Sequence, residues 1–262
     1  MHILPDKVKN EIDKVSEIAG FLWERQWAER NAGNISINLS SFFENNISDK
    51  PNKLIKYNFP KDAGGMLLFV TGKGSRLRHL VDRIKETSCI IKINDEANAY
   101  SIIWGGEKDG FEVTSEIITH VLIHVFNLEN NPQNKIVLHT HPTELIVLSH
   151  HPIFKDQDKF NHSLWKMCPE IKLFVPQGVY CAQYALSGTQ ALAEITIEGL
   201  KTTNIVLWEM HGALATAENA EMAFDLLDVA NKGAKLILTA WSSGFDPAGL
   251  SMEQLEELGS II

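Results

Sequence analysis

The chain has 262 residues, of which 44% are hydrophobic and 22% are charged, a composition that excludes intrinsic disorder and collagen-like repetition. Its 33 acidic residues outnumber its 24 basic residues, which gives a formal net charge of −9. A nucleic-acid-binding protein needs a basic surface, so this balance argues against that function. It also requires that any phosphate be held by local donors.

The amino terminus and the cysteines point to a cytoplasmic protein. Residues 1–7 lack the basic and then apolar pattern of a signal peptide, and no apolar run approaches the roughly 20 residues that cross a bilayer. Cys89, Cys168 and Cys181 are odd in number and form no CxxC pair. We therefore expect no disulfide framework, no membrane partner and a reducing cytoplasmic location.

The first half of the chain predicts one helix followed by several strands. Apolar residues recur at helical spacing between Asp6 and Trp23, and residues 29–33 then permit a turn. Residues 41–65 are polar and rich in Asn, Lys, Asp and Pro, which predicts a surface excursion. Strands are expected at 34–40, 66–71, 89–94 and 99–104, and the next helix at 114–128.

The second half continues to mix helices and strands. Strands are expected at 135–140, 173–175, 179–182 and 205–209, and helices at 142–149, from Ser187 or Thr189 to about 200, at about 218–240 and at about 252–258. Several strands follow one another without a crossover helix, so the sheet should be mixed and largely antiparallel. No composition shift marks a boundary. We expect residues 1–262 to form a single α/β domain, an α/β/α sandwich with helices on both faces of the sheet.

Ten histidines are the one compositional excess, and two of them end a predicted strand. His139 and His141 lie two residues apart, so both imidazoles project from one face of the sheet, and Pro142 ends the strand there. His211 follows another predicted strand and offers a third imidazole. Three protein ligands with an open fourth position are typical of a catalytic zinc site. A bare HxH motif is a weak signal, so ordinary surface or core histidines remain an alternative at this point.

A second group of titratable residues competes with the first. Glu116, His120 and His124 recur at i, i+4 and i+8, so they would share one face of a helix and could form a helical metal site. The spacing is not HExxH, however, and the group lies next to the apolar stripe of its helix. We therefore interpret His120 and His124 as packing or surface residues. The histidines interpreted as parts of a polar connection are His150, His151 and His162.

Three turns rich in small and polar residues could bind an anion without net positive charge. Residues 31–34 and 71–75 present backbone N–H groups at strand ends, where such groups can form a phosphate-binding nest. Residues 114–116 open a helix, whose amino end attracts anions. Ordinary turn and capping chemistry also explains each turn taken alone. Together, and next to a candidate metal site, the turns predict a phosphorylated substrate.

In their order and separation, these motifs resemble those of the class II aldolase and adducin family, which contains zinc-dependent sugar-phosphate aldolases and epimerases. The motifs that carry the resemblance are residues 31–36, 71–75, 114–116, 139–141 and 211–212. The resemblance covers about residues 20–245. Further details favour the branch that acts on L-rhamnulose 1-phosphate: residues 27–31, 99–105, the excursion at 41–65, and 207–208.

The resemblance implies a metalloenzyme and names its site residues. The implied ligands of one Zn²⁺ per subunit are His139, His141 and His211. Glu116 is the implied catalytic acid and base, and Glu170 matches a second catalytic carboxylate. Phosphate contacts are implied for Asn31, Gly33, Asn34, Gly74, Ser75, Thr114 and Ser115. Lys73 stands where this turn should have a small hydroxyl residue, so which of its atoms contact phosphate stays open.

The implied reaction is retro-aldol cleavage of L-rhamnulose 1-phosphate to dihydroxyacetone phosphate and L-lactaldehyde. The metal would stabilise negative charge on the three-carbon fragment, Glu116 would protonate that fragment, and Glu170 or a water would take the C4 hydroxyl proton. The alternatives are cleavage of fuculose phosphate, 4-epimerisation of ribulose phosphate and a non-catalytic adducin-like binding domain. The resemblance also implies a homotetramer, whereas the sequence itself leaves stereochemistry, native metal and oligomeric state open.

Overall fold

The computed structural model describes residues 4–43 and 53–260, and nine strands form its central sheet. The strands are β1 (Asn34–Asn38), β2 (Ile55–Lys56), β3 (Leu67–Thr71), β4 (Ser88–Ile93), β5 (Ala99–Gly105), β6 (Ile136–Thr140), β7 (Tyr180–Ala182), β8 (Ile205–Trp208) and β9 (Gly212–Ala217). Their order across the sheet is β2-β5-β4-β3-β1-β6-β9-β8-β7. Every neighbouring pair is antiparallel except β7 and β8. The expectation of a mixed, largely antiparallel sheet is confirmed.

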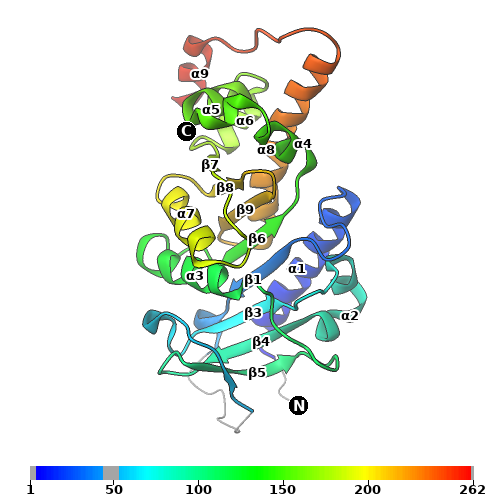
Figure 1. Cartoon of the computed structure of the whole chain (residues 1–262), viewed down its shortest axis with the longest axis vertical. Coiled ribbons are helices and arrows are strands. Elements are labelled where there is room, and N and C mark those ends of the chain that lie inside the picture. Colours follow the sequence, from blue (N-terminus) through cyan, green and yellow to red (C-terminus); the bar gives the residue numbers. More distant parts are fainter. Residues whose placement is uncertain (1–3, 44–52, 261–262) are drawn as a thin grey trace.

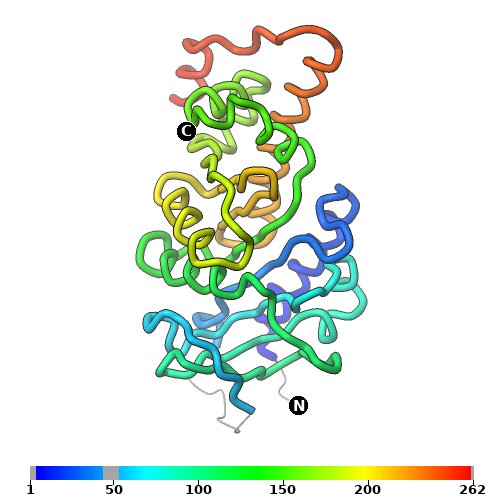
Figure 2. Tube along the Cα trace, in the orientation of Figure 1, coloured from blue at the N-terminus to red at the C-terminus, as the bar shows by residue number. Residues whose placement is uncertain are grey.

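Helices cover the sheet along its whole length (Figure 1). In the described residues they are α1 (Asp6–Glu24), α2 (Leu80–Thr87), α3 (Ile117–Asn130), α4 (Thr143–Ser149), α5 (Gln157–Trp165), α6 (Pro169–Phe174), α7 (Gln190–Leu200), α8 (Ala220–Ser242) and α9 (Met252–Gly259). Short 3-10 helices lie at Ser40–Phe42, Lys61–Ala63, Leu77–His79 and Pro152–Lys155. The strands succeed one another along the long axis of the molecule (Figure 1). The red tube of α9 lies beside the green tubes of α5 and α6 at the end beyond β7 (Figure 2).

The sheet separates two hydrophobic layers because the side chains of each strand alternate between its faces. Ile136 and Leu138 of β6 pack in a cluster with residues of α1, α4, α5, α6 and α8, whereas Val137 packs in a cluster with α3 and α7. A third cluster joins the first half of α3 to β3, β4 and β5. Helices thus cover both faces of the sheet, as the expected α/β/α arrangement requires.

One predicted strand is wrong, and several elements were not predicted. Residues 173 and 174 end α6 instead of forming a strand, because Pro169 favours a helical first turn and Phe174 is 62% exposed. The unpredicted β9 consists of small residues with little strand propensity. Pairing with β6 on one side and β8 on the other buries all six of its residues and overrides that propensity. The short helices α2, α5 and α6 were also missed.

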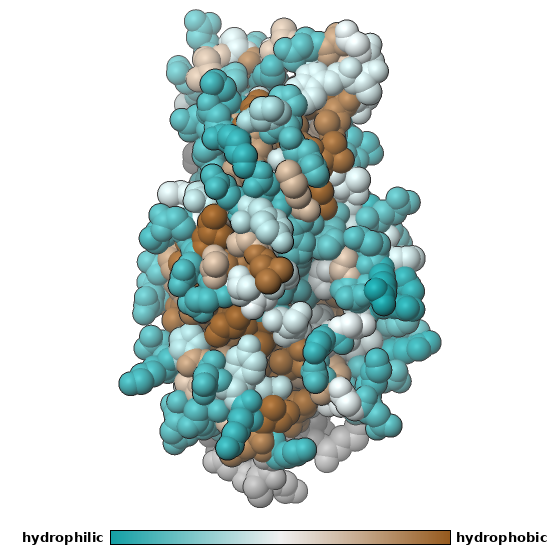
Figure 3. All heavy atoms as spheres, viewed as in Figure 1, coloured by the Kyte–Doolittle hydropathy of each residue, from teal (hydrophilic) through white to brown (hydrophobic). Residues whose placement is uncertain are grey.

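The expected excursion at 41–65 contains short regular elements. Residues 44–52 of the expected excursion lie outside the described residues, and the described remainder holds the edge strand β2 and a 3-10 helix. No helix in the described part of the chain is long and apolar enough to cross a bilayer. Cys89, Cys168 and Cys181 are all unpaired. Hydrophilic side chains surround smaller apolar areas on the face shown in Figure 3.

Candidate active site

Three histidines converge where β6 ends. His139 is the next-to-last residue of β6, His141 follows the strand, and His211 lies in the turn between β8 and β9. The ring centroids of His139 and His141 are 5.2 Å apart, and they lie 5.0 and 5.3 Å from that of His211. One ligand atom from each ring lies within 4.8 Å of the other two. Within residues 4–43 and 53–260, this is the one group of three or more His, Cys, Asp or Glu that could hold a metal.

In His139 and His141, a hydrogen bond to Nδ1 leaves Nε2 free to bind a metal. His139 Nδ1 donates to the carbonyl oxygen of Ala213 at 3.0 Å, and His141 Nδ1 donates to Glu29 Oε1 at 3.0 Å. Because both partners only accept, each ring keeps a lone pair on Nε2. Burial lowers the pKa of both His139 and His211, which favours the neutral form that binds metals. The donor set therefore fits a divalent metal ion.

The tight turn before β9 holds His211 from several sides. Met210 has a φ of +59°, and its backbone N–H donates to Ser149 Oγ at 2.9 Å. The ring of Trp208 stacks on that of His211 with a centroid distance of 5.1 Å. Gly212 leaves no room for a side chain, since an added Cβ would lie within 2.9 Å of both other imidazoles. The third imidazole is thus positioned by the fold.

Glu116 immediately precedes α3 and is 4% exposed. Asn34 Nδ2 donates to its Oε2 at 2.7 Å, and the Ser187 hydroxyl donates to its Oε1. Burial raises the pKa of this carboxyl, but the nearby His139 and the hydrogen bonds from Ser187 and Asn34 lower it further than burial raises it. Asn34 is also the partner of His139 across β1 and β6, so the carboxylate lies beside the metal-ligand candidates. A charged, buried carboxylate there can take a proton from a bound substrate and return it.

In the competing group on α3, three of the four ring nitrogens of His120 and His124 contact side chains of β1, and the group is not one that could hold a metal among the described residues. His120 Nδ1 and His124 Nε2 lie 2.7 and 2.8 Å from Ser36 Oγ, and the remaining nitrogen of His120, Nε2, contacts Asn34 Oδ1. Both rings are buried. The interpretation of His120 and His124 as packing residues is confirmed, and their surface alternative is wrong.

The structure joins the three candidate phosphate turns to this site. Gly33 has a φ of +78°, and an added Cβ would lie 2.8 Å from the carbonyl oxygen of His139. In the second turn, the carbonyl oxygen of Thr71 accepts from the backbone N–H of Thr114 at 3.0 Å. Thr114 in turn precedes Glu116 and accepts from its backbone N–H through Oγ1 at 3.3 Å. The turns at 31–34 and 114–116 and the Thr71 end of the second turn therefore lie near the catalytic candidates, and Asn31 and Ser115 are exposed.

Lys73, the departure from the family pattern, is held by the opposite turn. Its Nζ lies 2.7 Å from Glu112 Oε2, and its backbone N–H donates to the Glu112 carbonyl oxygen at 2.8 Å. Gly74 and Ser75 line a hollow of about 300 Å³ in which cations predominate. The other lining residues are Arg76, His79, Arg83, Glu86, Thr87 and Lys108. Local positive charge is thus available beside this turn despite the acidic balance of the chain.

Glu170 does not share a hollow with the three histidines. It belongs to α6 and accepts a hydrogen bond from the Cys168 thiol at 2.5 Å, which lowers the pKa of the carboxyl. It lines a hollow of about 330 Å³ together with Arg25, Asp228 and Lys232, and none of the three histidines lines that hollow.

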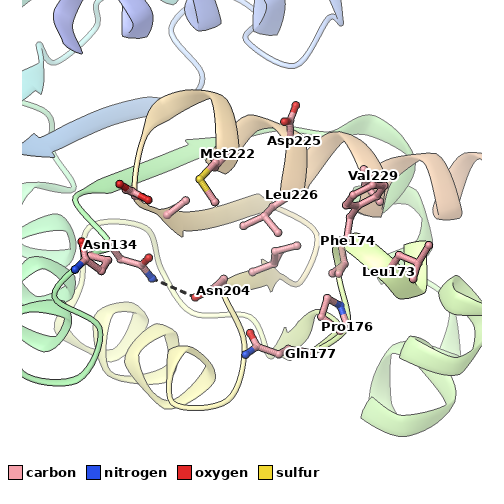
Figure 4. Close-up of a pocket in the computed structure, with 16 residues that line it drawn as sticks. Asn134, Leu173, Phe174, Pro176, Gln177, Asn204, Met222, Asp225, Leu226 and Val229 are labelled. Carbon is pink, nitrogen blue, oxygen red and sulfur yellow. Dashed lines mark hydrogen bonds between the residues drawn. The ribbon is translucent and has the colours of Figure 1, made fainter. Parts of the chain in front are cut away.

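A larger, mostly apolar cavity of about 680 Å³ lies away from the histidines, between α6, α8 and the strand β8. Figure 4 shows Leu173, Phe174, Leu226 and Val229 in its wall. At one end Asn134 Nδ2 donates to Asn204 Oδ1 at 3.2 Å. None of the predicted site residues lines this cavity, so its size does not make it the catalytic site.

Sequence reasoning missed the residues that support the site. Ser187 is distant from Glu116 along the chain, so only the fold shows that the two meet. Glu29 was part of a quoted motif, but its bond to His141 depends on tertiary structure. Ser36 could have been found, because it lies two residues after Asn34 and so projects from the same face of β1.

Comparisons with known proteins agree with this geometry. The model of the family described as class II aldolase and adducin N-terminal domain matches residues 13–238. The chain is 36% identical over 255 residues to a rhamnulose-1-phosphate aldolase from Bacteroides thetaiotaomicron, covering 95% of this chain and 92% of that protein. Its fold is similar to that of a sugar-phosphate aldolase from Thermotoga maritima, with a TM-score of 0.80, 28% identity and coverage of 93% and 100%.

A more distant solved structure shows the fold alone. It is an L-fuculose 1-phosphate aldolase, with a TM-score of 0.61, 19% identity and coverage of 99% of this chain and 98% of that one.

Proposed function

The chain belongs to the class II aldolase and adducin family, and from this membership we propose that it cleaves L-rhamnulose 1-phosphate to dihydroxyacetone phosphate and L-lactaldehyde. It is an aldolase, a carbon–carbon lyase. The substrate follows from the rhamnulose-1-phosphate aldolase with which the chain shares 36% identity over 95% of its length. The distant fuculose aldolase supports the alternative substrate only through its fold.

The observation that carries the proposal is the convergence of three imidazoles beside a charged, buried carboxylate. His139, His141 and His211 would hold one Zn²⁺ through nitrogens that the hydrogen bonds to Ala213 and Glu29 leave free. When bound, this ion supplies Lewis-acid stabilisation of the negative charge that develops as the carbon–carbon bond breaks. An adducin-like binding domain would not need such a set of ligands.

Glu116 transfers the proton at the carbon that becomes the hydroxymethyl group of dihydroxyacetone phosphate. In the synthetic direction the charged carboxylate removes a proton from this carbon. In the cleavage direction it delivers to the carbon a proton that it has first taken up from water, and the proton of the C4 hydroxyl leaves through the second base. Asn34 and Ser187 each donate to one carboxylate oxygen, so the carboxylate is oriented and its charged form is stabilised. A lysine forming a Schiff base with the substrate is not needed.

Backbone and hydroxyl donors of the three turns bind the phosphate. The proposed contacts are Asn31, Gly33, Asn34, Gly74, Ser75, Thr114 and Ser115. The Asn34 side chain already bonds to Glu116 and His120, so its phosphate contact falls mainly to the backbone. The cations around Gly74 and Ser75 add an attractive field where a dianion would sit.

Glu170 remains the proposed second acid and base, which takes the proton of the C4 hydroxyl. Within one chain it lines a hollow without the histidines, so this role requires that a neighbouring subunit bring it to the site. A homotetramer, as expected for the family, would allow that arrangement. We place the enzyme in the cytoplasm, where its three unpaired cysteines would stay reduced.

A substrate panel tests the proposal. The purified, zinc-loaded protein is given L-rhamnulose 1-phosphate, L-fuculose 1-phosphate and L-ribulose 5-phosphate, and dihydroxyacetone phosphate is detected with glycerol-phosphate dehydrogenase and NADH. We expect the highest kcat/KM with rhamnulose phosphate and no inactivation by borohydride. Faster cleavage of fuculose phosphate would show that the proposed substrate is wrong, and epimerisation without cleavage would show that the proposed reaction is wrong.

A further inference from the structure

A continuous chain of buried hydrogen bonds leads from Glu116 into the layer between β1 and α3. Asn34 Nδ2 donates to Glu116 Oε2 at 2.7 Å, and His120 Nε2 lies against Asn34 Oδ1. Ser36 Oγ lies 2.7 Å from His120 Nδ1 and 2.8 Å from His124 Nε2. None of these five residues is more than 9% exposed. Strand residues two apart and helix residues four apart thus face one another.

The donors and acceptors allow only one direction of donation along this series of hydrogen bonds. The Glu116 carboxylate only accepts, so Asn34 must present its amide N–H to it and its carbonyl oxygen to His120. His120 Nε2 must therefore carry a proton. Burial lowers the pKa of His120 to about 4, so the ring is neutral near pH 7 and its Nδ1 accepts the Ser36 hydroxyl proton. Ser36 Oγ is then free to accept from Nε2–H of His124.

The opposite direction of hydrogen-bond donation would be less stable. A proton donated from Ser36 to His124 would leave the lone pairs of Ser36 Oγ and neutral His120 Nδ1 facing each other at 2.7 Å. Charging His120 would remove that clash, but it would place a cation in a fully buried position and leave Nδ1–H of His124 as a buried donor. His124 Nδ1 has no partner among the described residues, so the tautomer that leaves this nitrogen unprotonated is favoured, because it avoids a buried N–H group without an acceptor.

We propose that His120, oriented by Ser36 and His124, is a positioning residue that fixes the Asn34 amide so that its N–H group faces Glu116. If the amide turned over, its carbonyl oxygen would lie against the carboxylate, and one of the two donors that orient the proposed base would be lost. The histidines act through Asn34 and do not touch the substrate. This inference rests on the proposed role of Glu116.

The test isolates proton transfer from bond cleavage. Zinc-loaded enzyme and dihydroxyacetone phosphate are mixed in D₂O, and NMR follows the replacement of one hydroxymethyl proton by deuterium. Removal of that proton needs Glu116 in its charged form. His120→Leu should lower kcat for exchange about tenfold or more, change KM less than about threefold, and move the acidic limb of the rate to higher pH. The limb moves because a carboxylate that loses a hydrogen-bond donor gains a proton more readily.

Two further variants separate positioning from packing. In His120→Gln, Nε2 is the same number of bonds from Cα as in histidine, so donation to Asn34 and most of the rate should return. Thr119→Val is the matched control, since Thr119 is buried on the same helix and its hydroxyl has no partner in the described part of the chain. It should leave the rate and the pH limb unchanged.

Each outcome decides one claim. If the wild-type enzyme shows no exchange, the proposed role of Glu116 fails and this inference fails with it. If the wild type exchanges but His120→Leu keeps its rate and pH limb, the positioning role alone is wrong. If His120→Leu does not fold or bind zinc, Ser36→Ala carries the test. It should shift the limb in the same direction by a smaller amount, and an unchanged profile overturns the inference.

Discussion

Adding a single methyl group at Gly212 should weaken both the metal site and the fold. A Cβ there would lie 2.6 Å from the carbonyl oxygen of Thr140, 2.8 Å from Cδ2 of His141 and 2.9 Å from Cε1 of His139. Ordinary contact begins at 3.4 Å, so each ring must move by about 0.5 Å or more. Metal–ligand distances tolerate deviations of only about 0.2 Å, so we expect Gly212→Ala to bind zinc at least about tenfold more weakly.

The expected loss of folding stability is similar in size to the roughly 1.4 kcal/mol that a tenfold loss of zinc affinity represents. Overpacking costs about 1–3 kcal/mol, and the lower chain entropy of unfolded alanine offsets about 0.4–1 kcal/mol of it, so the metal-free variant should lose about 1–2 kcal/mol. Urea unfolding measures this loss, and competition with a chelating dye measures zinc affinity. Gly20→Ala is the control, because its Cβ meets only Val81 Cγ2 at 3.7 Å. Zinc affinity in Gly212→Ala equal to that of Gly20→Ala would refute the packing of Gly212 against the two rings.

The remaining predictions concern the site residues and pH. Glu116→Gln should retain zinc but lose cleavage by about 10²-fold or more, since an amide cannot carry the proton; turnover like that of the wild type would remove Glu116 from its role. His141→Ala should lose zinc by elemental analysis, and an unchanged content would refute the ligand set. Burial lowers the pKa of His120 from 6.5 to about 4 and of His124 to about 3. The unfolded chain therefore binds more protons below pH 6.5, and the metal-free protein should lose stability as the pH falls towards 4. If the urea concentration at the midpoint of unfolding stays constant between pH 6.5 and 4, His120 and His124 are not buried as neutral rings.

The sequence was informative wherever a short-range period decides the structure. The two-residue spacing of His139 and His141 correctly placed both rings on one side of β6, and the helical spacing from Asp6 correctly predicted α1. Strands that follow one another without a crossover helix predicted the largely antiparallel α/β sheet, and the order of the motifs carried the resemblance to the family. These features depend on residues close together in the chain, so local patterns are enough to find them.

The missed features depend on contacts between distant segments. The small residues of β9 form a strand only because β6 and β8 pair with them on both sides. Ser187 lies in the loop before α7 and donates to Glu116, and no sequence pattern near either residue predicts this contact. His120 and His124 were placed on the correct helix face, but their hydrogen bonds to Ser36 required the packing of α3 on β1.

The most direct test of the account is cleavage of L-rhamnulose 1-phosphate before and after removal of the metal. The purified enzyme is assayed, dialysed against a chelator, assayed again and then titrated with Zn²⁺. Activity should vanish on chelation and return in proportion to zinc, reaching its maximum at one ion per subunit. Cleavage that persists in the metal-free enzyme, or a zinc-loaded enzyme that makes no dihydroxyacetone phosphate, would contradict the account.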